Sequence, residues 1–329
     1  MKLIKALIIG FATVLLLEFV FVSCAKEPQP LRVGVVVWPG CESFYLARDL
    51  GYYKNTPIKL LDYPSDSELM RAYRNGDIEA MNVTLDQAWL LAESTTDLRI
   101  VLIQDFSDGG DAIVAKPEIK NLQDLKGRRV GVESTTLEAF VLSRALEQVG
   151  MSPKDVQIVS LLESKNESVF KQESIDALVT YEPTVCKLRM MGANLLFNSR
   201  QIPGEIIDVM VMRESVLTKQ LSVAKFLIDG WFRSLDYLQK HPQDAARRIA
   251  PHEGVTPEQF LKSLTGIRLP DVQENQKILG KNDATSLAAA RRLAKFMVEK
   301  NLLKKAIVPT AVFDARLVND VKVAIFKHQ

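Results

Sequence analysis

The sequence of 329 residues is poor in the side chains that metal sites and disulfide frameworks need, with three cysteines and three histidines. None of the cysteines lies in a CxxC or other metal-like pattern, so we expect no metal site. The motifs GxSxG, HExxH and the P-loop are absent as well, and we expect no cofactor and no catalytic residue. No long block carries charge of one sign, and the net charge is +2, which argues against a nucleic-acid partner.

The first two dozen residues differ from the rest of the chain. Lys2 and Lys5 precede an apolar run from residue 6 to residue 22, and the small Ser23 stands before Cys24. A positive start, an apolar middle and a small residue at a boundary are typical of an export signal. The polar segment AKEPQP that follows is typical of a tether rather than of a folded domain.

This segment resembles a bacterial lipoprotein signal. The resemblance implies that residues 1–23 are removed, that Cys24 is acylated, and that residues 24–30 tether the protein to a membrane outside the cytoplasm. Ala25 is similar to the residue that directs such proteins to the outer membrane. Two alternatives stay open, namely an uncleaved anchor that spans the bilayer and a plain secretory signal.

From residue 31 onward, short apolar runs alternate with segments of helical period. Continuous apolar runs such as LRVGVVV are typical of strands that are covered on both faces. The alternation predicts βαβ units in two α/β lobes with mostly parallel sheets. The predicted strands are Leu31–Val37, Pro57–Tyr63, Ile78–Val83, Leu98–Gln104, Asp111–Lys116, Arg129–Val132, Val156–Ser160, Ile175–Thr180, Asn194–Phe197 and Ile206–Met212.

Beyond about residue 213 the pattern predicts helices and no further strand of comparable quality. The predicted helices of this tail are Val223–Gln239, Gln243–Ile249, Pro257–Leu264, Thr285–Glu299 and Val312–Val323. Earlier in the chain, three predicted helices begin with the spacing of a capping box, at Ser65, Thr84 and Thr135.

Ligands bind beyond the carboxyl ends of the strands in open parallel sheets, so the residues that follow each predicted strand are candidates. Trp38 follows the first strand and offers a flat apolar face with one donor; alternatively, it only plugs the edge of the sheet. Asp86 and Glu182 follow other strands, although an acid in the first turn of a helix is stabilised by the helix dipole in any case.

Ser134, Thr135 and Thr136 combine backbone N–H groups with hydroxyls, which suits a carboxylate, sulfonate or phosphate, although an ordinary N-cap has the same residues. The segment Asp108-Gly109-Gly110-Asp111 predicts a crossover between lobes, or a tight surface turn. Several carboxylates and few arginines follow the strands. This mixture favours a ligand with a positively charged or hydrogen-bond-donating group, such as an amine, a pyrimidine-like heterocycle or a zwitterion.

Four segments together resemble the periplasmic substrate-binding proteins of the thiamine-precursor, sulfonate and nitrate group of ABC importers. They are LRVGVVVWPGCESFYLARDLGYYKNTPIKLL, RNGDIEAMNVTLDQA, DGGDAIVAKPEIKNLQDLKGRRVGVESTTLEAFVLSRAL and SIDALVTYEPTVCKL. They occur in the order of the family and span most of residues 31–213. The chain departs from the family pattern at Glu79, where Asp is usual, and at Tyr181, where Trp is usual.

The resemblance implies a type II periplasmic binding protein fold, with a hinge and a ligand cleft between two lobes. Residues 31–110 and 205–329 would form lobe 1 with the helical tail, and residues 111–204 would form lobe 2. The positions that match the family suggest these cleft residues: Trp38, Cys41, Glu42, Asp86, Asp108, Ser134, Thr135, Thr136, Tyr181, Glu182 and Asp208.

We therefore expect a monomeric solute-binding lipoprotein that delivers a small organic ligand to an ABC permease. A receptor of the same fold that signals to a membrane sensor is an alternative, which Ala25 favours. A pyrimidine-synthase-like enzyme is a weaker one, because His241, His252 and His328 all lie in the helical tail, away from the predicted strand ends. Cys41 and Cys186 fall in different lobes and are expected to be separate thiols, with a disulfide left open.

Overall fold

A computed structural model describes residues 29–133, 136–161, 166–171 and 174–321. The signal segment with Cys24, and the candidates Ser134 and Thr135, lie outside the described residues. Within the described part of the chain, no helix combines the length and the apolar character that crossing a bilayer requires.

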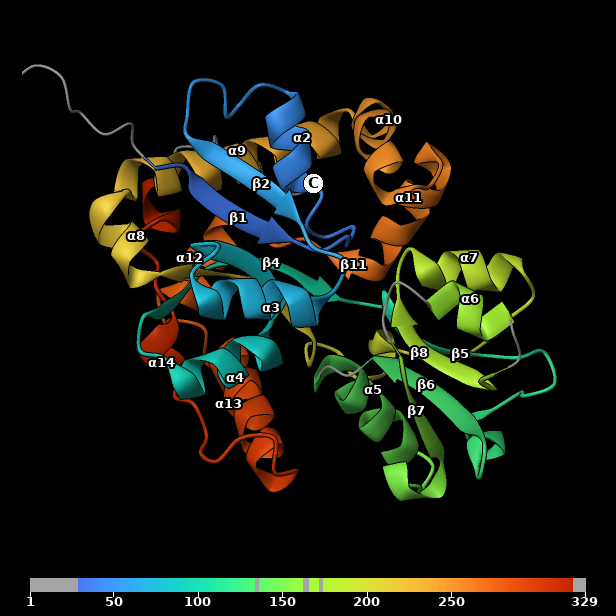
Figure 1. Ribbon diagram of the computed structural model, residues 1–329. Coiled ribbons are helices and arrows are strands. Elements are labelled where there is room, and N and C mark those ends of the chain that lie inside the picture. The colour runs from blue at the N-terminus through green and yellow to red at the C-terminus, as the bar shows by residue number, and fades with distance from the viewer. Residues whose placement is uncertain (1–28, 134–135, 162–165, 172–173, 322–329) are drawn as a thin grey trace, which may run out of the picture. The chain divides into compact units, whose positions relative to one another are not determined.

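The strands form two separate sheets (Figure 1). The six-stranded sheet has the order β11-β4-β10-β3-β1-β2, and the five-stranded sheet has the order β7-β6-β8-β5-β9. We call each sheet with the helices packed on it lobe 1 and lobe 2, respectively. Lobe 1 contains β1 (Leu31–Val35), β2 (Ile58–Asp62), β3 (Ala80–Thr84), β4 (Leu98–Ser107), β10 (Ile207–Arg213) and β11 (Ile267–Arg268). Lobe 2 contains β5 (Asp111–Ala115), β6 (Arg129–Glu133), β7 (Gln157–Leu161), β8 (Ala177–Tyr181) and β9 (Asn194–Asn198).

Both sheets are mixed rather than mostly parallel, although the α/β class itself is confirmed. In lobe 1, β1 runs parallel to β2 and β3, whereas β10 runs antiparallel to β3 and β4. In lobe 2, β6 runs parallel to β7 and β8, whereas β5 runs antiparallel to β8 and β9. The difference arises because β5 and β10 enter their sheets directly from the other lobe, without the crossover helix that joins parallel neighbours.

Helices cover the sheets and make up most of the C-terminal third (Figure 1). Those between the strands are α2 (Ser43–Asp49), α3 (Asp66–Asn75), α4 (Leu85–Ser94), α5 (Thr136–Glu147), α6 (Asn166–Lys171) and α7 (Thr184–Met190). Those after β10 are α8 (Glu214–Lys219), α9 (Leu221–Lys240), α10 (Pro242–Glu253), α11 (Pro257–Ser263), α12 (Val272–Leu279), α13 (Ala284–Glu299) and α14 (Pro309–Val312).

The helical tail differs from the prediction in four places. The sequence pattern missed α8, α12 and the two-residue strand β11, which is too short to produce an alternating pattern. The predicted helix Val312–Val323 is wrong, because α14 ends at Val312 and Phe313 instead forms a β-bridge with Ile100 of β4. That bridge fixes an extended backbone at the point where the helix was expected to continue.

Helix α9 anchors the tail on lobe 1 through a buried aromatic contact. Trp231 of α9 and Phe44 of α2 have ring centroids 4.4 Å apart, and both side chains are fully buried. Truncating such a side chain to alanine costs about 3–5 kcal/mol. The contact also sets the position of α10, which follows α9 directly and packs on α2.

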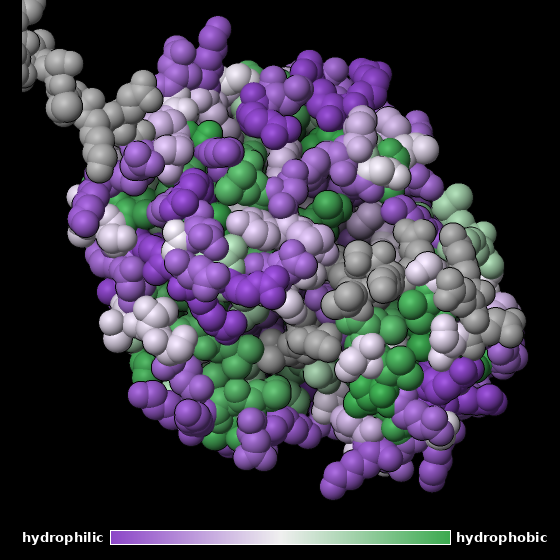
Figure 2. Space-filling view, in the orientation of Figure 1, coloured by the Kyte–Doolittle hydropathy of each residue, from purple (hydrophilic) through white to green (hydrophobic). Residues whose placement is uncertain are grey.

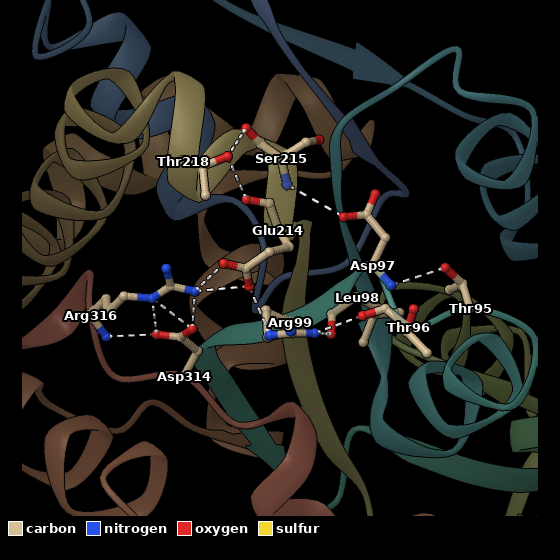
Figure 3. A network of polar contacts seen from close by, with 10 residues as sticks. All are labelled: Thr95, Thr96, Asp97, Leu98, Arg99, Glu214, Ser215, Thr218, Asp314 and Arg316. Carbon is tan, nitrogen blue, oxygen red and sulfur yellow. Dashed lines mark hydrogen bonds and ion pairs between the residues drawn. The ribbon is translucent and has the colours of Figure 1, made fainter.

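A second anchor is polar and lies at the start of β4 (Figure 3). Arg99 of β4 and Arg316 of the C-terminal segment both pair with Glu214 of α8, at 2.8 and 2.9 Å. Arg316 also pairs with Asp314 at 2.5 Å. Burial alone would raise the pKa of Asp314, yet the hydrogen bonds from Arg316 hold that pKa below its usual range. Each carboxylate of this network thus faces an arginine.

Apolar exposure is scattered over the described surface. Hydrophilic side chains cover most of the face in Figure 2, and hydrophobic ones gather near α4 and α13 and over part of lobe 2. The most exposed large apolar side chains come from β7, the end of α7, α9 and the residue before α14. They are Ile158, Met190, Met191, Phe226 and Val308.

Candidate functional site

Two short segments connect the lobes and are bonded to each other. Ser107 ends β4, and its hydroxyl lies 2.7 Å from the hydroxyl of Ser199 in the return segment after β9. The Ser199 hydroxyl also accepts a hydrogen bond from the backbone N–H of Gly109 at 2.6 Å. Gly109 has a φ of +115°, a conformation that favours glycine. The predicted crossover at residues 108–111 is therefore confirmed.

Trp38, in the loop after β1, meets lobe 2 across this crossover. Its indole N–H donates to the Asp105 carboxylate at 3.0 Å. A Cβ at Gly40 would lie 2.0 Å from the same carboxylate oxygen, so only glycine permits this approach. The indole packs edge-on against Tyr181 at the end of β8, with centroids 5.7 Å apart. Trp38 thus contacts the other lobe rather than only plugging the edge of its own sheet.

A small cavity with a volume of about 30 Å³ lies beside this aromatic pair. In this closed arrangement it has room only for groups about the size of a water molecule, so a small organic molecule would require its walls to move apart. Both lobes contribute to its wall, and none of the described residues that line it is a lysine, arginine or histidine. The lining residues are Val36, Trp38, Asp66, Asn82, Thr84, Asp111, Leu137, Tyr181 and Asp208.

Three aspartates of the wall come from three different elements. Asp66 begins α3 and accepts a hydrogen bond from the Gln87 side chain at 2.6 Å. Asp111 begins β5, next to the crossover, and is hydrogen-bonded by Ser107. Asp208 of β10 lies opposite Asp105 of β4 in the sheet register. The exposed fraction of each of these four aspartates is 7% or less.

Burial shifts the ionisation of these aspartates strongly. It raises the pKa of Asp66 to about 6 and that of Asp105 to about 6. Burial, together with the charges of nearby aspartates, raises the pKa of Asp111 to about 7. The pKa of Asp208 is raised well above its usual value by burial and then by the Asp105 charge. A cation in the cavity would favour the ionised form of every one of these groups.

Further buried acids surround the cavity. Asp86 lies in the first turn of α4, Glu133 ends β6, and Glu138 lies in the first turn of α5. Each is at most 5% exposed, and burial and then the Glu133 charge raise the pKa of Glu138 well above its usual value. Within the described residues, no group of three or more His, Cys, Asp or Glu side chains is arranged to hold a metal ion.

The structure brings several of the predicted site residues together. Trp38, Tyr181 and Asp208 line the cavity. The charge of Asp86 reaches Asp66 and Asp111 of its wall and contributes to their raised pKa values.

Other candidates lie nearby without lining the cavity. Cys41 is fully buried, and its sulfur accepts a hydrogen bond from the Gln104 side chain at 3.6 Å. Glu42 is fully buried, and Glu182 accepts a hydrogen bond from the backbone N–H of Cys186 at 2.9 Å. Cys41 and Cys186 are both free thiols, so the two do not form a disulfide.

Two predicted candidates do not join the site in the described residues. Asp108 lies on the outside of the crossover, where its side chain is 56% exposed and pairs with Arg200 at 3.6 Å. The carboxylate that faces inward from this segment is that of Asp111. Thr136 begins α5, but its side chain is outside the described residues, as are Ser134 and Thr135.

The expectation that every histidine lies away from the strand ends is wrong for His252. Its Nδ1 lies 2.8 Å from Glu42, and its Nε2 lies 3.3 Å from Asp62, the last residue of β2. The reason is the packing of α10 on α2, which brings the end of a helix in the tail back to the first strands.

The sequence analysis missed Asp66, Asn82, Thr84 and Asp111 as lining residues. Asp66 follows the second predicted strand closely, so the strand-end argument would have found it. Asp111 begins a strand instead of following one, and it faces the cavity because β5 runs antiparallel to β8. No feature of the sequence alone marks that direction.

The comparisons with known proteins agree with this architecture. The model of the family described as NMT1/THI5 like matches residues 38–245, which is more than half of the chain. The chain belongs to the NMT1/THI5-like family. It is 25% identical over 228 residues to the taurine-binding periplasmic protein of Escherichia coli (strain K12), covering 62% of this chain and 71% of that protein. It is 23% identical over 315 residues to a putative thiamine biosynthesis protein of Haemophilus influenzae, covering 92% and 96%.

Solved structures of this fold include binding proteins and an enzyme. The alkanesulfonate-binding protein SsuA from Xanthomonas axonopodis pv. citri superposes with a TM-score of 0.72 at 19% identity, covering 88% of this chain and all of that chain. The desulfurization enzyme DSZB superposes with a TM-score of 0.64 at 15% identity, covering 88% and 98%. The resemblance to periplasmic substrate-binding proteins and the expected fold class are confirmed.

Proposed function

We propose that this member of the NMT1/THI5-like family is the extracytoplasmic solute-binding protein of an ABC importer. Its ligand is a small organic molecule with a positively charged or hydrogen-bond-donating group, such as an amine, a pyrimidine-like heterocycle or a zwitterion. The observation that carries the proposal is the cavity between the lobes, with Asp66, Asp111 and Asp208 buried in its wall. The periplasmic relatives that bind taurine and alkanesulfonates support the transport role.

The acidic side chains of the wall favour one class of ligand over another. An ion in a poorly hydrated cavity interacts far more strongly with its neighbours than it does in water. A simple sulfonate would oppose the ionisation of the three buried aspartates and would be repelled by those that are ionised, whereas an ammonium group would favour their ionised form and hydrogen-bond to it. Taurine carries an amine as well as a sulfonate, so a zwitterion bound through its amine is compatible with both the wall and the family.

Ligand capture follows from the arrangement of the two lobes. The paired segments at residues 107–111 and 198–207 are the connections about which the lobes would open. When the lobes are closed, Trp38 and Tyr181 meet and shield the cavity. A closed form that persists only with ligand bound presents a distinct surface to a permease, which is how binding proteins of this kind signal occupancy.

The proposal is tested by a thermal-shift screen of the purified protein against amines, pyrimidines, amino acids and sulfonates. A ligand that binds only the folded protein raises its melting temperature by mass action. We expect the largest shifts among amines and amine-bearing heterocycles. Shifts produced only by sulfonates without an amine would contradict the proposed ligand class.

We further propose that Cys24 is acylated and anchors the protein to a membrane. This rests on the sequence signal alone. A Cys24→Ser variant should lose the lipid and leave the membrane fraction, as measured by fractionation and metabolic labelling with a fatty acid. A variant that stays in the membrane after alkaline extraction would instead support an uncleaved anchor.

A further inference from the structure

A second group of buried acids lies beyond the aromatic pair. Glu42 precedes α2 and Glu253 ends α10, with exposed fractions of 0% and 5%. Both carboxylate oxygens of Glu253, and Oε2 of Glu42, are buried with no hydrogen-bond partner among the described residues. A buried carboxylate without a partner costs free energy in the empty protein, so its presence points to a group that the binding site receives.

Among the described residues, His252 provides a hydrogen-bond partner for only one oxygen of Glu42 and Glu253, namely Oε1 of Glu42. The imidazole stacks on Tyr45 with centroids 3.9 Å apart, and it bridges Glu42 and Asp62. The hydrogen bond to Glu42 raises the pKa of His252, which favours an imidazolium that balances the Glu42 charge. The adjacent Glu253 has no equivalent partner.

The third acid comes from the other lobe. Glu182 directly follows Tyr181 of the aromatic pair and is held by the backbone N–H of Cys186. Burial first, and then the charges of Glu42 and Glu182, raise the pKa of Glu253 to about 9, while Lys187 of α7 opposes them. The charge of Glu182, which precedes α7 in lobe 2, therefore reaches Glu253 at the end of α10 in lobe 1. A second contact between the same regions joins Gln259 of α11 to the sulfur of Met190 at 3.3 Å.

We propose that Glu42, Glu182 and Glu253 form a second cation-recognising subsite, so that the ligand carries two positively charged groups rather than one. This deepens the proposed function and rests on it. One group of the ligand would be held by the aspartates of the cavity, and the other by the three glutamates. The ligand's middle would lie along Trp38 and Tyr181, which line the cavity and are close in sequence to Glu42 and Glu182.

Two observations favour an organic dication over a metal ion. The acids are not arranged as a metal site in the described residues, so hydrogen-bonding nitrogens spaced along a molecule fit better than one ion. Cys41 also links the two sets, because burial and then the charges of Asp105, Asp208 and Glu42 raise its pKa. Trp38 and Tyr181, which contact each other and line the cavity, are also close in sequence to Glu42 and Glu182, so the glutamates lie near the aromatic end of the cavity.

The second subsite would also couple ligand binding to proton release. With the lobes closed and the site empty, Glu253 is protonated at neutral pH, since its pKa is raised to about 9. A second ammonium group would favour the ionised form and expel this proton. Binding of a dication should therefore release about one proton more than binding of a monocation.

The test is calorimetric titration of the purified protein with matched pairs of amines. The pairs are linear diamines from 1,3-diaminopropane to 1,8-diaminooctane against the monoamines of the same length, and 1,4-bis(aminomethyl)benzene against benzylamine. We expect at least one diamine to bind about tenfold or more tightly than its monoamine, which corresponds to about 1.4 kcal/mol. At pH 7 its binding heat should depend on the buffer, because a proton is released.

Glu253→Gln should reduce the affinity for that diamine about tenfold, abolish the extra proton release and leave the affinity for the monoamine unchanged. Glu182→Gln provides the same test from the other lobe if the first variant melts at a much lower temperature. Glu118→Gln, at an exposed position of lobe 2, is the matched control and should change neither affinity nor proton release.

The outcomes separate this inference from the proposed function. If monoamines and diamines bind equally, and Asp111→Asn weakens both, the cation-binding cavity stands and the second subsite is wrong. If Glu253→Gln weakens monoamine and diamine to the same extent, the glutamate is not a separate subsite, and the inference is wrong. If no amine of either series binds, the proposed ligand class itself is contradicted.

Discussion

Two groups of acidic residues in this protein have opposite surroundings. At the start of β4, Glu214 and Asp314 each pair with arginine, and their network ties the C-terminal segment to α8 and the sheet (Figure 3). In the cavity, the hydrogen-bond partners of Asp66 and Asp111 among the described residues are neutral groups, an amide and a hydroxyl. The carboxyl groups of the two regions therefore differ in their partners, which are arginines in the network and neutral groups in the cavity.

The pKa shifts express this difference. That of Asp314 is lowered by Arg316 despite burial, whereas those of Asp66 and Asp111 are raised by burial. An acid with a lowered pKa contributes to the stability of the empty protein at neutral pH, and one with a raised pKa opposes it. Retaining acids of the second kind costs stability, which is expected where residues serve binding rather than folding.

The largest expected effect is on ligand affinity. Asp111→Asn removes a buried carboxylate from the cavity and should weaken a cationic ligand about 10- to 100-fold, since a hydrogen bond to a charged group contributes about 1.5–3 kcal/mol. Asp314→Asn is the matched control, because it changes the same residue type in the arginine network. Calorimetry with the best amine of the screen should detect no change in the control. Equal losses in both variants would remove the distinction between the two regions.

The next effect is on the pH dependence of stability. Because the pKa of Asp111 is about 7 in the folded protein and about 3.9 when unfolded, its contribution is fully present below about pH 4 and is lost as the pH rises towards 7. The empty protein should therefore lose stability over this window, and Asp111→Asn should lose less. Urea unfolding at several pH values measures this.

Asp314 should behave in the opposite sense. Its pKa is lowered in the folded protein, so its contribution is present above about pH 3.9 and is lost as the pH falls through the folded pKa. Urea midpoints of Asp314→Asn should therefore approach those of the wild type at acidic pH. A variant whose deficit grows as the pH falls would contradict this account.

A smaller effect is expected from the arginine side of the network. Arg316 is 44% exposed on its side chain, so solvent screens its ion pairs, and Arg316→Ala should lower the free energy of unfolding by about 1 kcal/mol. Ligand affinity should not change. A matched decrease in affinity would mean that the C-terminal segment contributes to the cavity after all.

The smallest effect is expected from loss of the indole N–H of Trp38. Trp38→Phe keeps a ring against Tyr181 but removes the N–H that donates to Asp105. Losing one neutral donor to a buried carboxylate should change ligand affinity by about threefold to tenfold. Trp38→Ala, which also removes the ring, should have a larger effect in the same titration. Equal effects would assign the role of Trp38 to its N–H alone.

The sequence predicted the residues that follow strands better than those that begin them or lie in helices. Trp38 and Tyr181 could be identified because parallel strands end at one edge, where loops meet. Asp111 could not, because its direction depends on the antiparallel entry of β5. His252 and Glu253 reach the site through the packing of α10 on α2, a contact between distant segments that local patterns do not encode.

The central claim is that the cavity selects a positively charged group. Its most direct test is a comparison of benzylamine with benzenesulfonate, two rings of similar size and opposite charge, by calorimetry on the purified protein at pH 7. The account predicts measurable binding of the amine, which Asp111→Asn weakens, and none of the sulfonate. Binding of the sulfonate with no binding of the amine would contradict it.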